Sequence, residues 1–234
     1  MAVAFFLFLT SGLAIAKNSS QTSSPPELAV EATSKTEPSV EVVYFIYYGN
    51  FDCQVIQLKL AKFENELPNN VHFEALPVVV SRGQVGEDEF YTVNQYADLF
   101  FVLDFFGQEK LLRNRIFQTV MDTLANTGEF ALVDIDYQMN FLNDYNLSVN
   151  EYREAIESDI VDRKIEKALD YISKFNINSV PSMVINGKTL IQYNPEKGTD
   201  HFFKAVNSAI NEAIHPKPKP RVVSKSTNSS QKSE

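Results

Sequence analysis

The chain of 234 residues is poor in the residue types that most enzyme motifs require: it has one cysteine, three histidines, eight glycines and no tryptophan. A single cysteine, Cys53, excludes an intramolecular disulfide, and therefore a dithiol cycle within one molecule. We find no glycine-rich phosphate-binding motif. The histidines, His72, His201 and His215, lie in different predicted elements, so neither a zinc site nor a catalytic triad is indicated, and we expect no metal and no cofactor.

Basic residues are also scarce relative to acidic ones, and the formal net charge is -9. Binding to nucleic acid or to an anionic membrane needs a basic surface that displaces counterions, so we expect neither. The carboxylates of residues 151–170 alternate with Arg and Lys at helical spacing. This pattern is typical of a solvated, ion-paired helix face. With 44% hydrophobic residues, the chain is able to bury a core.

The two ends of the chain differ from its middle. Residues 1–16 are apolar and end in Ala-Ile-Ala, which predicts a cleavable signal peptide, export to the periplasm and no stable membrane insertion after cleavage. A membrane anchor is the alternative. Residues 17–39, rich in Ser, Thr, Pro and Glu, predict a disordered linker, and residues 215–234 predict a disordered tail rich in Pro, Lys and Ser.

Between these ends, hydrophobic periodicity predicts one domain over 40–214. A strand at 40–48, a helix at 51–67 and a strand at 71–80 form a βαβ unit, whose strands should be parallel. The helix at 51–67 has a broad apolar face, which comprises Val55, Ile56, Leu58, Leu60, Ala61 and Phe63. The remaining predicted elements are helices at 88–106, 108–125, 135–145 and 148–174, a hairpin of strands 182–185 and 189–192, and a helix at 200–214.

Two segments carry a resemblance to a known family. Residues 44–53 read Tyr-Phe-Ile-Tyr-Tyr-Gly-Asn-Phe-Asp-Cys, and residues 180–188 read Val-Pro-Ser-Met-Val-Ile-Asn-Gly-Lys, followed by Asn194, Pro195 and Gly198. Together they resemble the DsbA family of periplasmic thiol-disulfide oxidoreductases over residues 40–214. The resemblance implies an α/β fold of the thioredoxin type with a large all-helical insertion at about 82–175.

The resemblance also assigns roles to individual residues. Cys53 matches the resolving cysteine of the family, and Asn50 stands in place of the nucleophilic one. Phe51 and Asp52 occupy the dipeptide between them, and Pro181 matches a proline that is cis in the family and lies against the active site, preceded by Val180. The implied catalytic positions are thus Asn50 and Cys53. The implied substrate-binding positions are Phe51, Asp52, Val180 and Pro181.

The chemistry of these residues leaves several interpretations open. Asn50 is a favoured helix N-cap, with an oxygen that can accept from the amide of Asp52 or Cys53. Cys53 is either a buried apolar side chain or a reactive thiol, and the carboxylate of Asp52 beside it disfavours the thiolate. A cis bond before Pro181 would leave the backbone of Val180 open to an extended peptide, or it would only hold the turn.

Three functions follow from these interpretations. In the first, the protein lacks dithiol oxidase activity and binds unfolded or partner polypeptides as a chaperone or assembly factor. In the second, Cys53 exchanges disulfides with a partner thiol or glutathione as a one-cysteine oxidoreductase or isomerase. In the third, which resembles the kappa-class glutathione transferases, the start of the helix stabilises the thiolate of glutathione.

Overall fold

The computed structural model describes residues 39–216. By its internal contacts the chain divides into two units, residues 1–35 and 36–234, and all described residues belong to the second. The predicted signal peptide at 1–16, and the predicted linker and tail except for residues 39, 215 and 216, lie outside the described residues.

The described residues fold into four strands and seven helices, and five of the helices lie between the second and third strands. This order is the predicted α/β fold with a helical insertion. The elements are β1 (Val40–Ile46), α1 (Phe51–Glu66), β2 (Val71–Pro77), α2 (Glu87–Phe105), α3 (Glu109–Thr127), α4 (Ile135–Asn143), α5 (Val149–Ile156), α6 (Asp159–Phe175), β3 (Ser182–Ile185), β4 (Thr189–Gln192) and α7 (Gly198–Ile214).

The strands form one mixed sheet in the order β2-β1-β3-β4. Strands β1 and β2 are parallel, as predicted for a βαβ unit, whereas β3 is antiparallel to both β1 and β4. The predicted hairpin between β3 and β4 is confirmed. Asn186 and Gly187 have φ angles of 53° and 59°, the positive values that a type I′ turn requires, and the Lys188 N–H donates to the Ile185 carbonyl at 3.0 Å.

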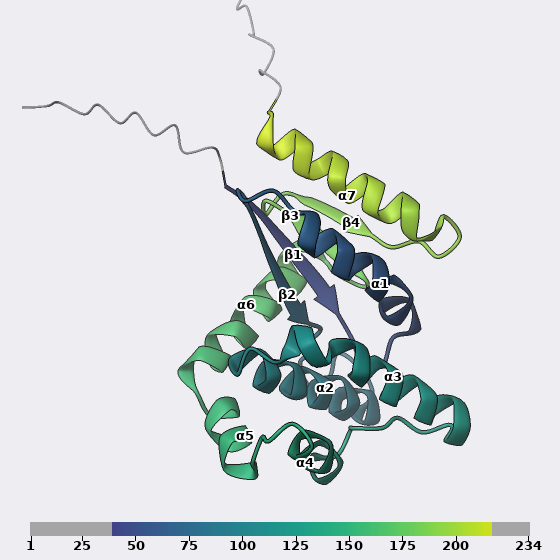
Figure 1. Cartoon of the computed structure of the whole chain (residues 1–234), viewed down its shortest axis with the longest axis vertical. Coiled ribbons are helices and arrows are strands. Elements are labelled where there is room, and N and C mark those ends of the chain that lie inside the picture. The colour runs from purple at the N-terminus through teal and green to yellow at the C-terminus, as the bar shows by residue number, and fades with distance from the viewer. Residues whose placement is uncertain (1–38, 217–234) are drawn as a thin grey trace, which may run out of the picture. The chain divides into compact units, whose positions relative to one another are not determined.

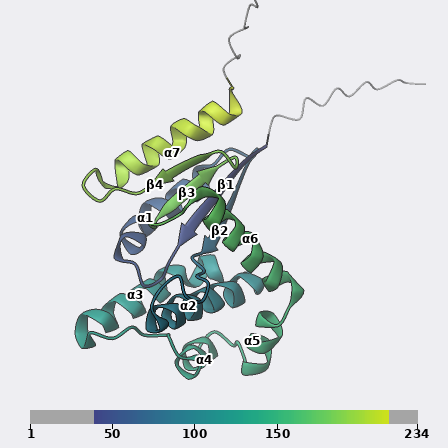
Figure 2. The same cartoon turned by 180° about the vertical axis from the view of Figure 1, so that it is seen from behind.

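Helices cover both faces of the sheet (Figures 1 and 2). Alternate residues of β1 point to opposite faces, so Tyr44 meets α1 through Gln57, whereas Phe45 meets the ring of Tyr171 on α6. Helix α7 lies on the α1 face, where the rings of Phe63 and Phe203 have centroids 5.3 Å apart. The buried face of α1 therefore packs against both the sheet and α7.

The predicted apolar face of the first helix is only partly right. Ile56 and Leu60 are fully buried, but Leu58 is 84% exposed and Val55 43% exposed. In a helix with 3.6 residues per turn, the buried positions 53, 56, 57, 60 and 63 share one face, which leaves Val55 and Leu58 on the other.

The single helix predicted at 148–174 is wrong: two helices, α5 and α6, fill that range. A capping box lies at the start of α5, where Ser148 Oγ accepts from the Glu151 N–H at 3.3 Å. A second serine, Ser158, caps α6 by accepting from the Val161 N–H at 3.2 Å. The second cap makes a new helix start energetically acceptable within an otherwise continuous helical pattern.

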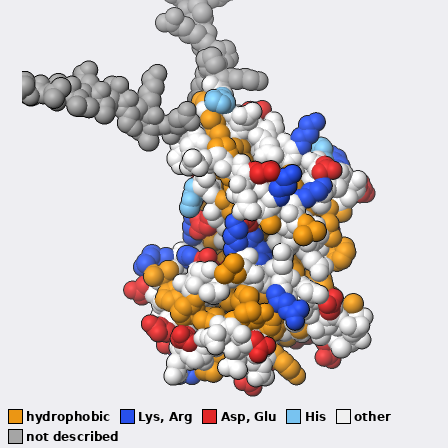
Figure 3. Space-filling model, viewed as in Figure 1, with side chains coloured by type: hydrophobic (Ala, Val, Ile, Leu, Met, Phe, Trp, Pro, Cys, Tyr) orange, Lys and Arg blue, Asp and Glu red, His pale blue; other side chains and the backbone are white. Residues whose placement is uncertain are grey.

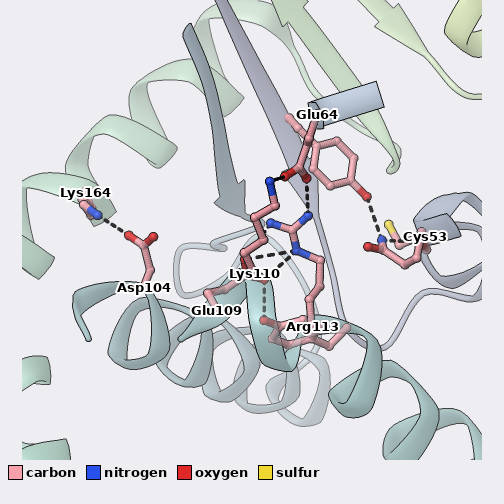
Figure 4. Close-up of polar contacts among 10 residues, drawn as sticks. Cys53, Glu64, Asp104, Glu109, Lys110, Arg113 and Lys164 are labelled. Carbon is pink, nitrogen blue, oxygen red and sulfur yellow. Dashed lines mark hydrogen bonds and ion pairs between the residues drawn. The ribbon is translucent and has the colours of Figure 1, made fainter. Parts of the chain in front are cut away.

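An ion-paired cluster joins α1 to α3 (Figure 4). The Arg113 guanidinium donates to both oxygens of Glu109, the shortest of these bonds being 2.6 Å, and to Glu64 Oε1 at 2.7 Å. Tyr48 donates to Glu109 Oε1 at 2.9 Å, and Lys110 pairs with Glu64 at 2.7 Å. Burial lowers the pKa of Arg113, but the two carboxylates outweigh burial and raise it above its ordinary value. Arg113 therefore stays charged.

Candidate functional site

The candidate site begins in the tight turn between β1 and α1. The Asn50 N–H donates to the Tyr47 carbonyl at 3.1 Å and so closes the turn. A Cβ atom on Gly49 would lie 2.6 Å from the Tyr47 ring, closer than real Cβ contacts come. Glycine at position 49 therefore lets the Tyr47 ring fold back over the turn.

Asn50 caps the helix, as predicted from the sequence. Its backbone is extended, with φ -107° and ψ 122°, and its Oδ1 accepts from the Cys53 N–H at 2.9 Å. The bond satisfies one of the free N–H groups of the first helical turn. A carboxamide has no nucleophilic lone pair comparable to a thiolate, so at this position Asn50 supplies a hydrogen-bonding group and no covalent chemistry.

Cys53 is the free cysteine of the described residues, and its side chain is 0% exposed. Burial raises the pKa of its thiol to about 12, and the Asp52 carboxylate adds a smaller increase. Hydrogen bonds with the Tyr47 backbone and the Tyr44 hydroxyl lower the pKa but do not compensate for burial. At neutral pH the thiol is therefore protonated and shielded from solvent, the opposite of an activated cysteine.

The groups beneath Cys53 are polar but neutral. Gln57 Nε2 donates to the Cys53 carbonyl at 2.7 Å and lies 3.5 Å from the Tyr44 hydroxyl oxygen. Burial raises the pKa of Tyr44 well above its ordinary value, with a further increase from Cys53, so this hydroxyl stays protonated. No cation contacts the sulfur among the described residues, so nothing there stabilises a thiolate.

Val180 and Pro181 lie at the same end of the sheet as Asn50, where β1 ends and β3 begins. The register places Ser182, the first residue of β3, opposite Phe45 near the end of β1, and α1 begins just beyond that end. The Val180–Pro181 peptide bond is cis, and the Tyr193 N–H donates to the Pro181 carbonyl at 2.9 Å. Within residues 39–216, neither the N–H nor the C=O of Val180 takes part in a hydrogen bond.

The side chains at this end of the sheet differ in how far they are exposed. Phe51 is 65% exposed, whereas Pro181 and Met183 are buried and Val180 is partly buried. A patch that included Met183 would have favoured peptide binding, but the side chain of Met183 points into the core beneath β3. The apolar side chains available to a partner are instead Phe51 and, further along α1, Val55 and Leu58. Sequence periodicity places Val55 and Leu58 in the core, so it misses them as surface residues.

A cavity of about 460 Å³ lies at the same end of the sheet, on the side of α6. Val79, Ser81 and Gln84, which line it, follow β2, and Asn176 and Ile177 connect α6 to the segment that contains Val180. Since β1 and β2 are parallel, the C-terminal ends of both strands lie at the same end of the sheet. No local sequence pattern indicates this cavity, because its walls come from segments about 90 residues apart.

Two further findings bear on function. Within the described part of the chain, no group of three or more His, Cys, Asp or Glu side chains is arranged to hold a metal ion. None of the helices between residues 39 and 216 is long and apolar enough to cross a membrane.

Comparison with known proteins shows similarity in sequence and in fold to DsbA proteins. No protein-family model matches the chain. The thiol:disulfide interchange protein DsbA of Pseudomonas aeruginosa is 24% identical over 174 residues, which cover 73% of this chain and 74% of that protein. The crystal structure of a variant of Pseudomonas aeruginosa DsbA superposes with a TM-score of 0.62 at 22% identity and covers 76% of this chain and 89% of that one.

A second similar structure is a complex of a Proteus mirabilis DsbA variant with the non-covalently bound peptide PWATCDS, at a TM-score of 0.57 and 19% identity, covering 74% of this chain and 88% of that one. The shared architecture defines the class: an α/β protein of the thioredoxin fold with a helical insertion. Within that class, the chain is similar in sequence and in fold to the DsbA thiol:disulfide interchange proteins.

Proposed function

We propose that this DsbA-like protein binds extended polypeptide segments at the end of the sheet around Phe51 and Val180, and that it does not oxidise dithiols. The observation that carries the proposal is the contrast, at one end of the sheet, between the buried, protonated thiol of Cys53 and the backbone groups of Val180, which have no hydrogen-bond partner among residues 39–216. In this proposal Asn50 caps the helix and Cys53 packs in the core. The binding site is formed by Phe51, Asp52, Val180 and Pro181.

The state of Cys53 supports the absence of oxidase activity. A dithiol cycle needs two cysteines in one molecule, and the chain has one. With the pKa of its thiol raised to about 12, only about one thiol in 10⁵ is ionised at pH 7, and the sulfur is out of reach of a substrate. The same burial counts against one-cysteine exchange with a partner thiol or glutathione, and against isomerase activity.

Two open features support binding. A strand-like ligand pairs with free backbone groups, and Val180 offers one N–H and one C=O at a fixed place beside the end of the sheet. Phe51 adds an exposed aromatic ring, a side chain that commonly anchors interfaces. The Proteus mirabilis complex is a precedent within this fold, because the DsbA variant in it holds its peptide without a covalent bond.

The remaining parts of the proposal concern context. Export to the periplasm rests on the apolar residues 1–16 and on the relationship to DsbA proteins. Glutathione-transferase activity has less support, because the export predicted from residues 1–16 would place the protein where glutathione is usually scarce. The partner in this proposal is an unfolded or partner polypeptide, with no nucleic acid and no cofactor.

The test uses a peptide whose binding is visible directly. The chain lacks tryptophan, so the tryptophan fluorescence of Pro-Trp-Ala-Thr-Ser-Asp-Ser, a cysteine-free peptide, reports binding without interference from the protein. We expect saturable binding, about tenfold weaker in Phe51→Ser. Leu111→Ser, which changes a 73% exposed side chain on α3, is the matched control and should bind normally. Absence of binding, or equal affinity in all three proteins, would refute the proposal.

A further inference from the structure

The connection between α4 and α5 contains a modification signal. Residues 144–148 read Asp-Tyr-Asn-Leu-Ser, and the last three form an Asn-x-Ser signal whose middle residue, Leu147, is not proline. In exported proteins such a signal marks an asparagine that an oligosaccharyltransferase glycosylates, provided that it lies in a surface loop. Bacterial enzymes of this class recognise a longer signal, with an acidic residue two positions before the asparagine. Asp144 stands at that position.

The complete signal occurs once in the chain. Two other Asn-x-Ser signals begin at Asn18 and Asn228, but Ala16 and Ser226 stand two positions before them, so neither has the acidic residue. Asn146 is therefore the one asparagine of the sequence that satisfies the longer signal.

The structure presents Asn146 in an exposed loop. Its φ is 60°, the left-handed conformation that often ends a helix, and the next N–H, of Leu147, donates to the Leu142 carbonyl at 3.2 Å. Leu147 is only 7% exposed and anchors the loop, whereas the side chain of Asn146 is exposed. Among residues 39–216 the carboxamide of Asn146 takes part in no hydrogen bond, so its Nδ2 is accessible to an enzyme.

Asp144 has no structural role within the described residues. It is the C-cap of α4, where the negative end of the helix dipole disfavours a carboxylate, and the last turn of α4 contains no basic residue. Its side chain is exposed and has no ion pair or hydrogen bond among residues 39–216. The end of a helix explains an asparagine at position 146, but it does not explain an acidic residue at 144.

Ser148 completes the signal at the start of α5. Its Oγ accepts from the Glu151 N–H and donates to Glu151 Oε2 at 2.7 Å. Both groups belong to the first turn of an eight-residue helix, so opening that turn alone frees the hydroxyl. Figures 1 and 2 show α4 and α5 at the end of the described part opposite α7, and Figure 3 shows acidic side chains exposed there.

We infer that Asn146 is an acceptor for N-linked glycosylation, with an oligosaccharide linked to a lipid pyrophosphate as the donor. In the transfer, Asn146 Nδ2 loses a proton and forms a bond to C1 of the first sugar, while the bond from C1 to the pyrophosphate oxygen breaks and the lipid pyrophosphate leaves. Neither reactant is oxidised or reduced. In the cell the transfer requires the export predicted from residues 1–16, and it is independent of polypeptide binding at Phe51 and Val180.

The test treats the purified, folded full-length protein with a bacterial oligosaccharyltransferase and its lipid-linked oligosaccharide, and measures the intact mass over time. We expect one added oligosaccharide and none in Asn146→Gln. Transfer should be about tenfold slower in Asp144→Asn, because the charge that the enzyme recognises is lost. Asn143→Gln, which changes a neighbouring exposed asparagine outside the signal, is the matched control and should be modified normally.

A second pair of variants separates the signal from the helix cap. Ser148→Thr keeps both the hydroxyl and the cap and should be modified, whereas Ser148→Ala should not, with folding of each variant checked by circular dichroism. Protein isolated from its own cells should carry an oligosaccharide at Asn146. No transfer to the unaltered protein, transfer that persists in Asn146→Gln, equal rates in Asp144→Asn and the unaltered protein, or an unmodified mass from its own cells would each overturn the inference.

Discussion

The substitution Arg113→Met tests how α1 is held in place. It removes the guanidinium that joins Glu64 of α1 to Glu109 of α3, while the methionine side chain fills much of the same volume. Arg113 is 8% exposed, and each of the two carboxylates is 5% exposed. The variant would therefore leave two carboxylates that have lost their main partner and have little access to water.

The expected loss of stability is large. Removal of one member of a buried ion pair typically costs about 3 to 5 kcal/mol, because the remaining charge is stranded. The value here should fall toward the lower end, since Tyr48 still donates to Glu109 and Lys110 still pairs with Glu64. The pair Lys110–Glu64 provides the contrast, since Lys110→Ala removes a 57% exposed partner and should cost less than about 1 kcal/mol.

The assay is urea unfolding followed by circular dichroism at pH 7, with the midpoints converted to free energies of unfolding. The double variant Arg113→Met/Glu109→Gln should be more stable than Arg113→Met alone, because it removes one of the stranded charges. A loss below about 1 kcal/mol in Arg113→Met, or a double variant that is no more stable than the single one, would refute the reasoning.

Three further predictions concern α1 and Cys53. Asn50→Ala should cost about 1 kcal/mol of unfolding free energy and Asn50→Asp much less, since only the alanine variant loses the cap on the Cys53 N–H; equal losses would contradict this assignment. Leu60→Ala should cost about 2 to 5 kcal/mol, whereas Leu58→Ser should cost less than about 0.5, as judged by thermal or urea unfolding, because only Leu60 is buried. Because burial raises the pKa of Cys53 from an ordinary 9.0 to about 12, its contribution to stability is complete below pH 9 and is lost as pH rises from 9 to 12; Cys53→Ala should flatten the alkaline fall in the urea midpoint, and curves of equal slope would argue that the thiol is exposed.

Much of the site geometry could be predicted because its signals are local. Asn50 caps α1 through a residue three positions away, and the turn at Asn186 and Gly187 is specified by two adjacent residues. Motifs of this kind depend on backbone conformation over a few residues, which the sequence determines directly.

The features that sequence patterns missed depend on distant contacts. Arg113 and Glu64 are 49 residues apart, so charge patterning along one helix could identify only the pair with Glu109, four residues away. The exposure of Leu58 depends on which side of α1 faces the sheet and α7. The position of β2 at the outside of the four described strands is a property of sheet order, which no single segment encodes.

The central claim is that polypeptides bind without thiol chemistry, and the most direct test compares two peptides that differ in one atom. Native full-length protein is titrated with PWATCDS and with its serine counterpart; oxidised glutathione is then added as the oxidant, and the mixtures are analysed by intact mass under non-reducing conditions. We predict similar affinities for the two peptides and no covalent adduct, since Cys53 is buried and protonated. Binding of the cysteine peptide alone, with a mixed disulfide at Cys53, would contradict the account.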